Sequence, residues 1–253
     1  MKRFLASVLL MLWVFPAFAD EAFFQEQLLE ANLGNAKAQF NLGLLHANGE
    51  GVPENDAMAF FWYRKAANQG VPEAQVNLGN MYYRGEGIPQ NYKEAANWYR
   101  KAANQGSARA QLNLGLLYDN GEGVPENNAE AAAWYRKAAN QGSAKAQFNL
   151  GLLYANGEGV PENDAEAVRW YRKAANQGSA RAQVNLGLLY DNGEGVPEND
   201  VKAYSWWSVA KAQGDEDATI NLDIVKKEMT KEQIAKGQVL ATKCWESEFQ
   251  DCD

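Results

Sequence analysis

Few side chains in this sequence of 253 residues could do chemistry. The chain has one histidine, His46, and two cysteines, Cys244 and Cys252, which are too few for the usual Cys/His zinc site. No serine or cysteine motif accompanies His46, and we expect it to pack in place of a tyrosine. We therefore predict no catalytic residue, no metal site, no cofactor and no enzymatic activity.

The two cysteines stand eight residues apart near the end of the chain. They lack the Cys-x-x-Cys spacing of a redox pair. In an oxidising compartment we expect a disulfide, Cys244–Cys252, that clamps the C-terminal tail. Two free thiols are the alternative.

Two loop patterns imitate ligand sites. Gly-x-Gly-Val-Pro resembles a phosphate-binding loop, but no Gly-Lys-Ser/Thr follows it and no strand precedes it. Asp119-Asn120-Gly121-Glu122 carries calcium-type ligands without the longer spacing of an EF-hand loop. We interpret the first pattern as a helix–helix turn and the second as solvated loop acids.

The first 19 residues have the pattern of a signal peptide. Lys2-Arg3 is a basic start, residues 4–14 form an apolar run, and residues 17–19 form a small-x-small cleavage site. The apolar run is shorter than the ~20 residues that a membrane helix needs. We predict cleavage after Ala19, a periplasmic or secreted protein, and no stable membrane insertion after cleavage; an uncleaved anchor is the alternative. The net charge of −8 argues against a nucleic-acid partner.

The rest of the chain is built from a unit of 36 residues that recurs five times. This unit must position the side chains considered above. Its most recognisable stretch is Trp134-Tyr135-Arg136-Lys137-Ala138-Ala139-Asn140-Gln141-Gly142, with further copies at Trp62, Trp98, Trp170 and, degraded, Trp206. A fixed period of this length indicates a stacked array in which each unit completes its neighbour's core. We divide the chain into a signal peptide, an N-terminal capping half-repeat, five repeats, and a degenerate half-repeat with a C-terminal capping helix: 1–19, 20–34, 35–70, 71–106, 107–142, 143–178, 179–214 and 215–253.

Each repeat is predicted to form two helices. In the third copy they cover roughly 108–119 and 129–141, with Ser107 and Asn128 as N-caps. The core-facing side chains would be Ala110, Leu114, Leu117, Tyr118, Ala131, Trp134, Tyr135, Ala138 and Ala139.

The end of the chain is predicted to cover the stack. Residues 215–226 keep a trace of a first helix. Thr230 and Gln233 could form a capping box for a last helix of about 231–246. We expect this helix to present Ile234, Val239, Leu240 and Trp245 to the core.

The repeat unit closely resembles the Sel-1-like repeat, a relative of the tetratricopeptide repeat. In the third copy the resemblance is carried by Ala110, Leu114, Gly115, Tyr118, Gly121, Gly123, Val124, Pro125, Ala131, Trp134, Tyr135, Ala138, Ala139 and Gly142. It departs from the pattern at His46, at Asn80 and at Trp207-Ser208-Val209. The resemblance implies an all-α, right-handed α/α superhelical solenoid used mainly as a protein–protein adaptor. It also implies roles of exported bacterial members in envelope assembly, host interaction and signalling, and β-lactam or peptidoglycan binding by some cysteine-rich relatives.

Candidate binding residues lie opposite the core stripe of the first helices, on the face expected to line the concave side of the superhelix. In the third repeat this face consists of Arg109, Leu112, Asn113, Leu116, Asp119 and Asn120. The candidates are an apolar column, a ladder of asparagines and three members of a variable column: Phe40, Val76, Leu112, Phe148 and Val184; Asn41, Asn77, Asn113, Asn149 and Asn185; Tyr83, Asp119 and Asp191. Arg84, next to Tyr83, is a further candidate. The asparagines could bond an extended peptide backbone. In the alternative, the apolar column packs between helices and the asparagines bond their own scaffold. The Trp/Tyr pairs are interpreted as core packing and the Arg-Lys pairs that follow them as a solvated outer face.

We therefore expect an exported, non-enzymatic scaffold that binds a protein or peptide through its concave face. The first alternative is a binder of peptidoglycan or of a host protein. A β-lactamase-like or peptidoglycan-acting enzyme comes last, because the sequence contains no nucleophile motif, metal cluster or paired acid and base.

Overall fold

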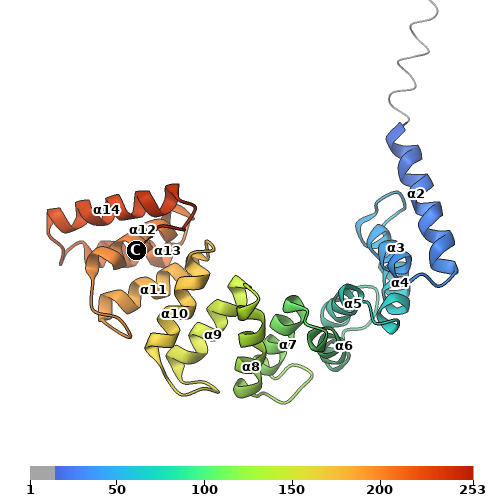
Figure 1. Ribbon diagram of the computed structural model, residues 1–253, viewed down its shortest axis with the longest axis horizontal. Helices are drawn as coiled ribbons and strands as arrows, with labels where there is room; N and C mark the ends of the chain where they lie inside the picture. Colours follow the sequence, from blue (N-terminus) through green and yellow to red (C-terminus); the bar gives the residue numbers. More distant parts are fainter. Residues whose placement is uncertain (1–14, 253) are drawn as a thin grey trace, which may run out of the picture. The chain divides into compact units, whose positions relative to one another are not determined.

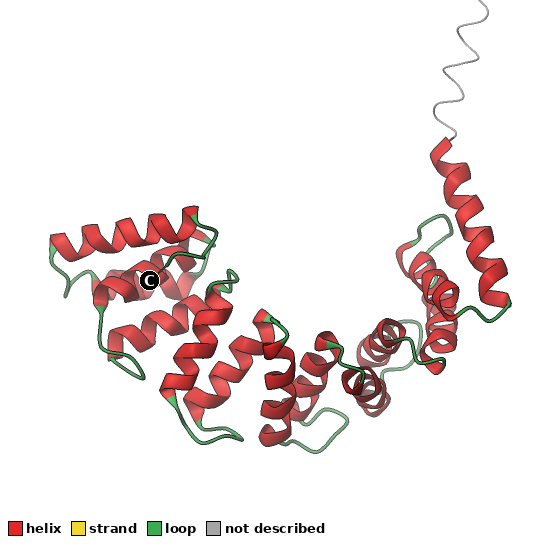
Figure 2. Cartoon of the chain, in the orientation of Figure 1, coloured by secondary structure: helices red, strands yellow, loops and turns green. Residues whose placement is uncertain are grey.

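The computed structural model describes residues 15–252, and their regular secondary structure is entirely helical (Figures 1 and 2). The helices in this range are α2 (Phe15–Asn32), α3 (Ala36–Asn48), α4 (Asp56–Asn68), α5 (Pro72–Arg84), α6 (Tyr92–Asn104), α7 (Ala108–Asn120), α8 (Asn128–Asn140), α9 (Ala144–Asn156), α10 (Asp164–Ala175), α11 (Ala180–Asn192), α12 (Asp200–Ala212), α13 (Glu216–Val225) and α14 (Lys231–Glu246). None of them is both long and apolar enough to cross a membrane. The all-α prediction is confirmed, whereas most of the predicted signal peptide falls on residues 1–14, outside the described range.

The helices alternate between two kinds. We call α3, α5, α7, α9, α11 and α13 the first helices of their repeats, and α4, α6, α8, α10 and α12 the second helices; α2 stands where a second helix would precede the array. The chain forms two compact units. One holds Met1–Ala110 with Glu122–Val124, and the other holds Gln111–Gly121 with Pro125–Asp253.

Caps explain where these helices begin and end. The Ser107 hydroxyl accepts the amide of Ala110 at 3.3 Å, as predicted. The second helix of the same repeat is capped one residue earlier than predicted. Asn127, in extended backbone, accepts the amide of Glu130 at 3.1 Å, and Asn128 is already helical. An N-cap needs non-helical backbone and a side-chain oxygen that accepts an amide of the first turn, and Asn127 meets both conditions.

The aromatic pairs pack the joints between helices, as expected. Tyr171 lies directly on α9 at Gly151, where an added Cβ would come within 2.7 Å of the ring. Trp170 belongs to a core cluster that joins residues of the preceding repeat, such as Ala131 and Tyr135, to Leu150 of its own repeat. The glycine is therefore needed for close approach of two helices.

Within each unit, buried glutamines tie successive repeats together, a feature that was not predicted from the sequence. In the second unit, the Gln147 amide donates to the Ala139 carbonyl at 3.0 Å and its oxygen accepts from Gln177 at 2.7 Å. Gln183 repeats the arrangement with Ala175 and Gln213. A buried amide is tolerated because its donor and acceptor are both satisfied.

The last helix has the predicted limits but a different buried face. The reciprocal capping bonds of Thr230 and Gln233 are both present. Val239 is 67% exposed and Trp245 is 47% exposed, so the prediction that they face the core is wrong.

The buried face of α14 follows a different spacing. Ile234, Gly237, Ala241 and Cys244 share one side of α14 at helical spacing, and this side packs on α12. Gly237 allows the approach, because a Cβ there would come within 2.5 Å of the Tyr204 ring. This contact also explains why the fifth repeat has Ser208-Val209 in place of the Arg-Lys pair. Val209 is buried in the core cluster beneath α14, where a lysine would lose its contact with water.

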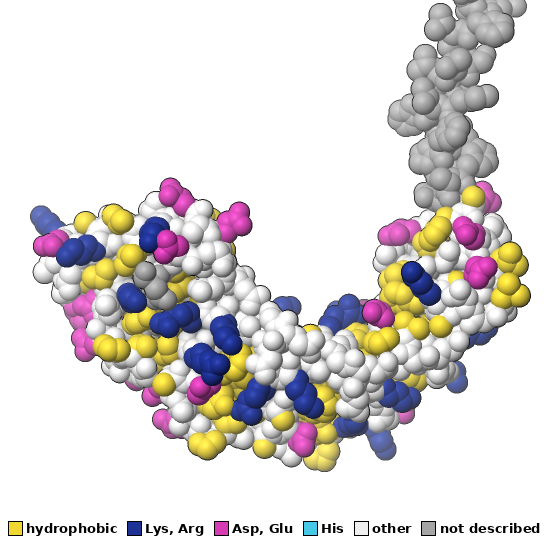
Figure 3. All heavy atoms as spheres, in the orientation of Figure 1, with side chains coloured by type: hydrophobic (Ala, Val, Ile, Leu, Met, Phe, Trp, Pro, Cys, Tyr) yellow, Lys and Arg dark blue, Asp and Glu magenta, His cyan; other side chains and the backbone are white. Residues whose placement is uncertain are grey.

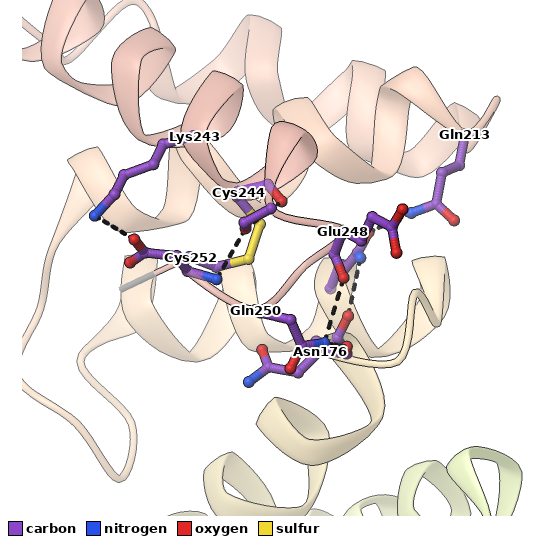
Figure 4. The surroundings of a disulfide bond; sticks show 11 residues. Asn176, Gln213, Lys243, Cys244, Glu248, Gln250 and Cys252 are labelled. Atoms are coloured by element: carbon purple, nitrogen blue, oxygen red, sulfur yellow. Dashed lines mark hydrogen bonds and ion pairs between the residues drawn. A yellow bond between two sulfur atoms is a disulfide. The ribbon is translucent and has the colours of Figure 1, made fainter.

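The C-terminal tail folds back beneath α14 (Figure 4). A disulfide joins Cys244 and Cys252, and the Lys243 ammonium pairs with the Asp251 carboxylate at 2.7 Å. The Gln250 amide donates to the Asn176 carbonyl at 3.1 Å. The tail therefore connects the last helix to the end of α10, two repeats earlier.

Candidate protein-binding surface

The first helices of the second unit share one exposed stripe. On α9 it consists of Lys145, Asn149, Leu152 and Asn156, whose spacing of four, three and four residues keeps them on one side of the helix. Lys145 and Asn156 are exposed, and Asn149 and Leu152 are half-buried. On α11 the equivalent residues are Arg181, Asn185, Leu188 and Asn192. We call these two sets the first-helix stripe.

A column of apolar side chains runs through the stripe at Leu152 and Leu188 and continues onto the first helices α7 and α13. Its members in the second unit occupy one position of successive first helices: Leu116, Leu152, Leu188 and Ile224. Leu116, Leu188 and Ile224 are 36%, 38% and 51% exposed. Figure 3 shows hydrophobic side chains at the surface of this unit among Lys and Arg side chains.

The sequence placed Leu116 on the face opposite the core, but the column formed by its equivalents in the other repeats was not predicted. A leucine at this position in four of the five repeats looks like core. In the third repeat, only the offset of Leu116 from the buried Leu114 and Leu117 shows that it points away from the core.

The predicted apolar column mainly packs within the scaffold. Val76, Leu112 and Val184 are buried. Phe40 and Phe148 are half-buried, with ring centroids 5.9 and 5.8 Å from Tyr63 and Tyr171. The column therefore packs between helices, as in the alternative interpretation, and does not line an open groove.

The asparagine ladder also bonds to the scaffold. Asn149 and Asn185 donate to the hydroxyls of Tyr135 and Tyr171 in the preceding repeats. Asn77 bonds Tyr63 and accepts from Arg109, Asn41 donates to Gln27 at 2.8 Å, and Asn113 is half-buried. An asparagine amide has two donor positions and two acceptor positions, so the tyrosine bond uses only part of the capacity of Asn149 and Asn185.

Burial raises the pKa values of the tyrosines that bond to the asparagine ladder. Burial raises the pKa of Tyr171 to about 12, against a smaller lowering by the Asn185 bond. Burial also raises the pKa of Tyr135, and the Asp119 carboxylate, which accepts its hydroxyl at 3.0 Å, raises it further.

The predicted variable column has a different environment in each copy. Burial raises the pKa of Asp119, and the Tyr135 bond opposes this. Burial raises the pKa of Asp191 as well, followed by the charges of Asp200, Glu228 and Glu198. Tyr83 packs on Tyr92 with ring centroids 5.2 Å apart, and burial followed by the Glu122 charge raises its pKa.

The first unit has a polar pocket beside its first helices. Its volume is about 380 Å³, and its walls include Tyr63, Asn77, Asn80 and Arg84. Two predicted residues, Asn77 and Arg84, are thus brought together there. Arg84 also pairs with Glu86 at 3.2 Å.

The remaining side chains that could take part in catalysis or metal binding have surroundings typical of packing. His46 meets the Phe24 ring edge-on at 5.8 Å, as expected for packing, and burial lowers its pKa. Residues 15–252 contain no cluster of His, Cys, Asp and Glu that could hold a metal ion.

The expected solvated outer face is only partly solvated. Lys137 lies 3.8 Å from the centroid of the Trp134 ring, and Lys101 and Lys173 cover Trp98 and Trp170 in the same way. The lysines of the Arg-Lys pairs therefore help to shield the tryptophans by cation–π contacts, while Arg136 and Arg172 lie over Tyr154 and Tyr190.

These features define a class of protein, the tandem α/α-repeat proteins, in which a regular scaffold presents side chains from successive first helices. The model of the Sel1 repeat matches five times, at residues 36–71, 72–107, 108–143, 144–179 and 180–215. The chain belongs to the Sel1 repeat family. Sel1 repeat proteins are generally non-catalytic scaffolds that mediate protein–protein interaction.

Solved structures agree with this assignment. The chain is 34% identical to a Sel1 repeat protein from Oxalobacter formigenes, with a TM-score of 0.78 and coverage of 93% of this chain and 98% of that one. It is 36% identical to c5321, a protective antigen of uropathogenic Escherichia coli strains with an SLR fold, with a TM-score of 0.77. That match covers 87% of this chain but only 46% of c5321, so the chain spans less than half the length of that relative. No curated protein matches the chain.

Proposed function

We propose that this chain is an exported, non-enzymatic adaptor that binds a segment of a partner protein along the first-helix stripe. One observation carries the proposal: Leu188 in the stripe, and Leu116 and Ile224 at the same repeated position of α7 and α13, reach solvent, whereas their neighbours in the repeat such as Leu186 and Leu189 are buried. Exposed apolar side chains framed by polar ones are typical of interaction sites.

The stripe can also provide specificity. Asn149 and Asn185 lie between the leucines and the cations of their helices, and part of their hydrogen-bonding capacity is left for a partner's backbone. The family's general role in protein–protein interaction supports this use of the surface.

Export is part of the proposal. The basic start, the apolar run and the cleavage pattern before Asp20 support it. The Cys244–Cys252 disulfide supports it as well, because such bonds persist in oxidising compartments. The similarity to a protein described as a protective antigen is in keeping with a location outside the cytoplasm.

A peptide-display selection on the protein without residues 1–19 tests the binding role. We expect enriched peptides to bind the parent protein and to lose binding to Leu188→Asp. Val239→Asp is the matched control, since Val239 is also apolar and exposed but lies on α14. Selected peptides that bind Leu188→Asp and the parent protein equally would refute this use of the stripe.

Export is tested separately by fractionation of cells that produce the full chain. We expect the mature protein in the periplasm or medium, with an N-terminus at Asp20 by mass spectrometry. Recovery of the protein with residues 1–19 intact in the cytoplasm would refute export.

A further inference from the structure

The charges of the first-helix stripe identify the kind of segment that it fits. Lys145 and Arg181 are the second residues of α9 and α11, and both are exposed. Neither helix has an acidic residue in its first turn. A cation near a helix N-terminus is unfavourable, because the backbone dipole is positive there.

The second helices do not share this placement of a cation near the helix N-terminus. α8, α10 and α12 all have acids in the first turn and bases in the last turn, which is the favourable arrangement. The first helices α9 and α11 keep cations where they cost stability. Local rules of this kind are usually broken where function requires it.

The cations share a surface with the exposed leucines. Lys145 and Leu152 are seven residues apart on α9, as are Arg181 and Leu188 on α11, and this spacing places each pair on one side of its helix. At the other end of the stripe, Asn156 and Asn192 donate to Glu158 and Glu194 at 3.3 Å each. The surface is therefore positive along one edge, apolar in the middle and negative along the other edge.

The occupant must also be elongated. The leucine column draws on separate helices, so one ligand that contacts Leu152 and Leu188 has to cross from α9 to α11. Asn149 and Asn185 can still bond backbone groups, which an extended chain leaves free and a helix does not.

We propose that the first-helix stripe of the second unit binds an extended acidic peptide segment with interspersed apolar side chains. The leucines receive the apolar side chains, and Lys145 and Arg181 pair with carboxylates of the segment. This inference rests on the proposed function and specifies the partner of the same surface.

Three labelled probe peptides of equal length test it: four repeats of Glu-Leu-Ser, of Lys-Leu-Ser and of Glu-Ser-Ser. By fluorescence anisotropy we expect only the Glu-Leu-Ser peptide to bind, and more weakly as salt is added. Lys145→Glu with Arg181→Glu should weaken this binding about tenfold, because two exposed ion pairs become repulsive. Lys211→Glu is the control, since Lys211 is an exposed base on the second helix α12.

Each other outcome overturns the inference. The acidic-partner idea fails if the Lys-Leu-Ser peptide binds as well as Glu-Leu-Ser, if no probe binds, or if the double charge reversal changes nothing. Self-association of the protein that Leu188→Asp abolishes would make a second copy the occupant instead. If display-selected peptides without acidic residues still depend on Leu188, this inference fails while the proposed function stands; if no peptide depends on Leu188, both fail.

Discussion

Replacing Gln147 by leucine tests whether the buried glutamines hold successive repeats together. Gln147 is 4% exposed and makes two hydrogen bonds, to the Ala139 carbonyl and from the Gln177 amide. Leucine has a similar size but can make neither bond. The Ala139 carbonyl keeps the Gly142 amide at 3.1 Å, so it is not left wholly without a donor. Two lost bonds at about 0.5–1.5 kcal/mol each give a loss of about 1–3 kcal/mol in the free energy of unfolding.

Urea denaturation followed by far-UV circular dichroism measures this loss from the midpoint and the slope. Gln238→Leu is the matched control, because Gln238 is an exposed glutamine on α14, and such surface changes are usually within about 0.5 kcal/mol. In the double variant Gln147→Leu with Gln177→Leu, the cost should be smaller than the sum of the single costs, since the two side chains share a bond. The reasoning is refuted if Gln147→Leu costs no more than Gln238→Leu, or if the two glutamine changes are additive.

Three further predictions concern packing, pH and the tail. Gly151→Ala should cost about 1–3 kcal/mol by overpacking, seen as a lower melting temperature, because the new Cβ would lie 2.7 Å from the Tyr171 ring; an unchanged melting temperature would contradict the packing. The pKa of Asp191 is raised in the folded protein, so the folded state holds the proton more tightly and stability falls as pH rises from the ordinary value of 3.8 through the raised one. Asp191→Asn should therefore reduce this fall in a pH series of unfolding curves, and an unaltered pH dependence would count against it. Opening the loop closed by the disulfide, with Cys244→Ser and Cys252→Ser together, should cost about 2–3 kcal/mol and expose the tail to proteolysis; equal protease resistance of the two proteins would exclude a clamping role.

The architecture could be predicted from the sequence because its signals are local and repeated. The 36-residue period, the glycines and the alternating apolar faces recur in five copies, and each signal is readable within one or two helical turns. The cap at Asn127 was missed by one residue because two adjacent asparagines compete for the position and only the backbone decides between them.

The binding surface could be located only in part. The sequence indicates which face of the first helices lies away from the core, and the stripe is found there. It does not separate Val184, which is buried, from Leu188, which is 38% exposed. Both are apolar and one turn apart, and the difference depends on how closely the neighbouring helices approach.

The sequence by itself determined the repeat, the helices and the absence of spelled-out catalytic motifs, because periodicity and capping act over short distances along the chain. Only the tertiary structure decided which repeated side chains remain in solvent, how α14 turns its glycine face to α12, and how asparagines and tyrosines pair across repeats. Those outcomes depend on contacts between residues far apart in the chain. The leucines and cations of the first-helix stripe acquire their proposed role from this placement.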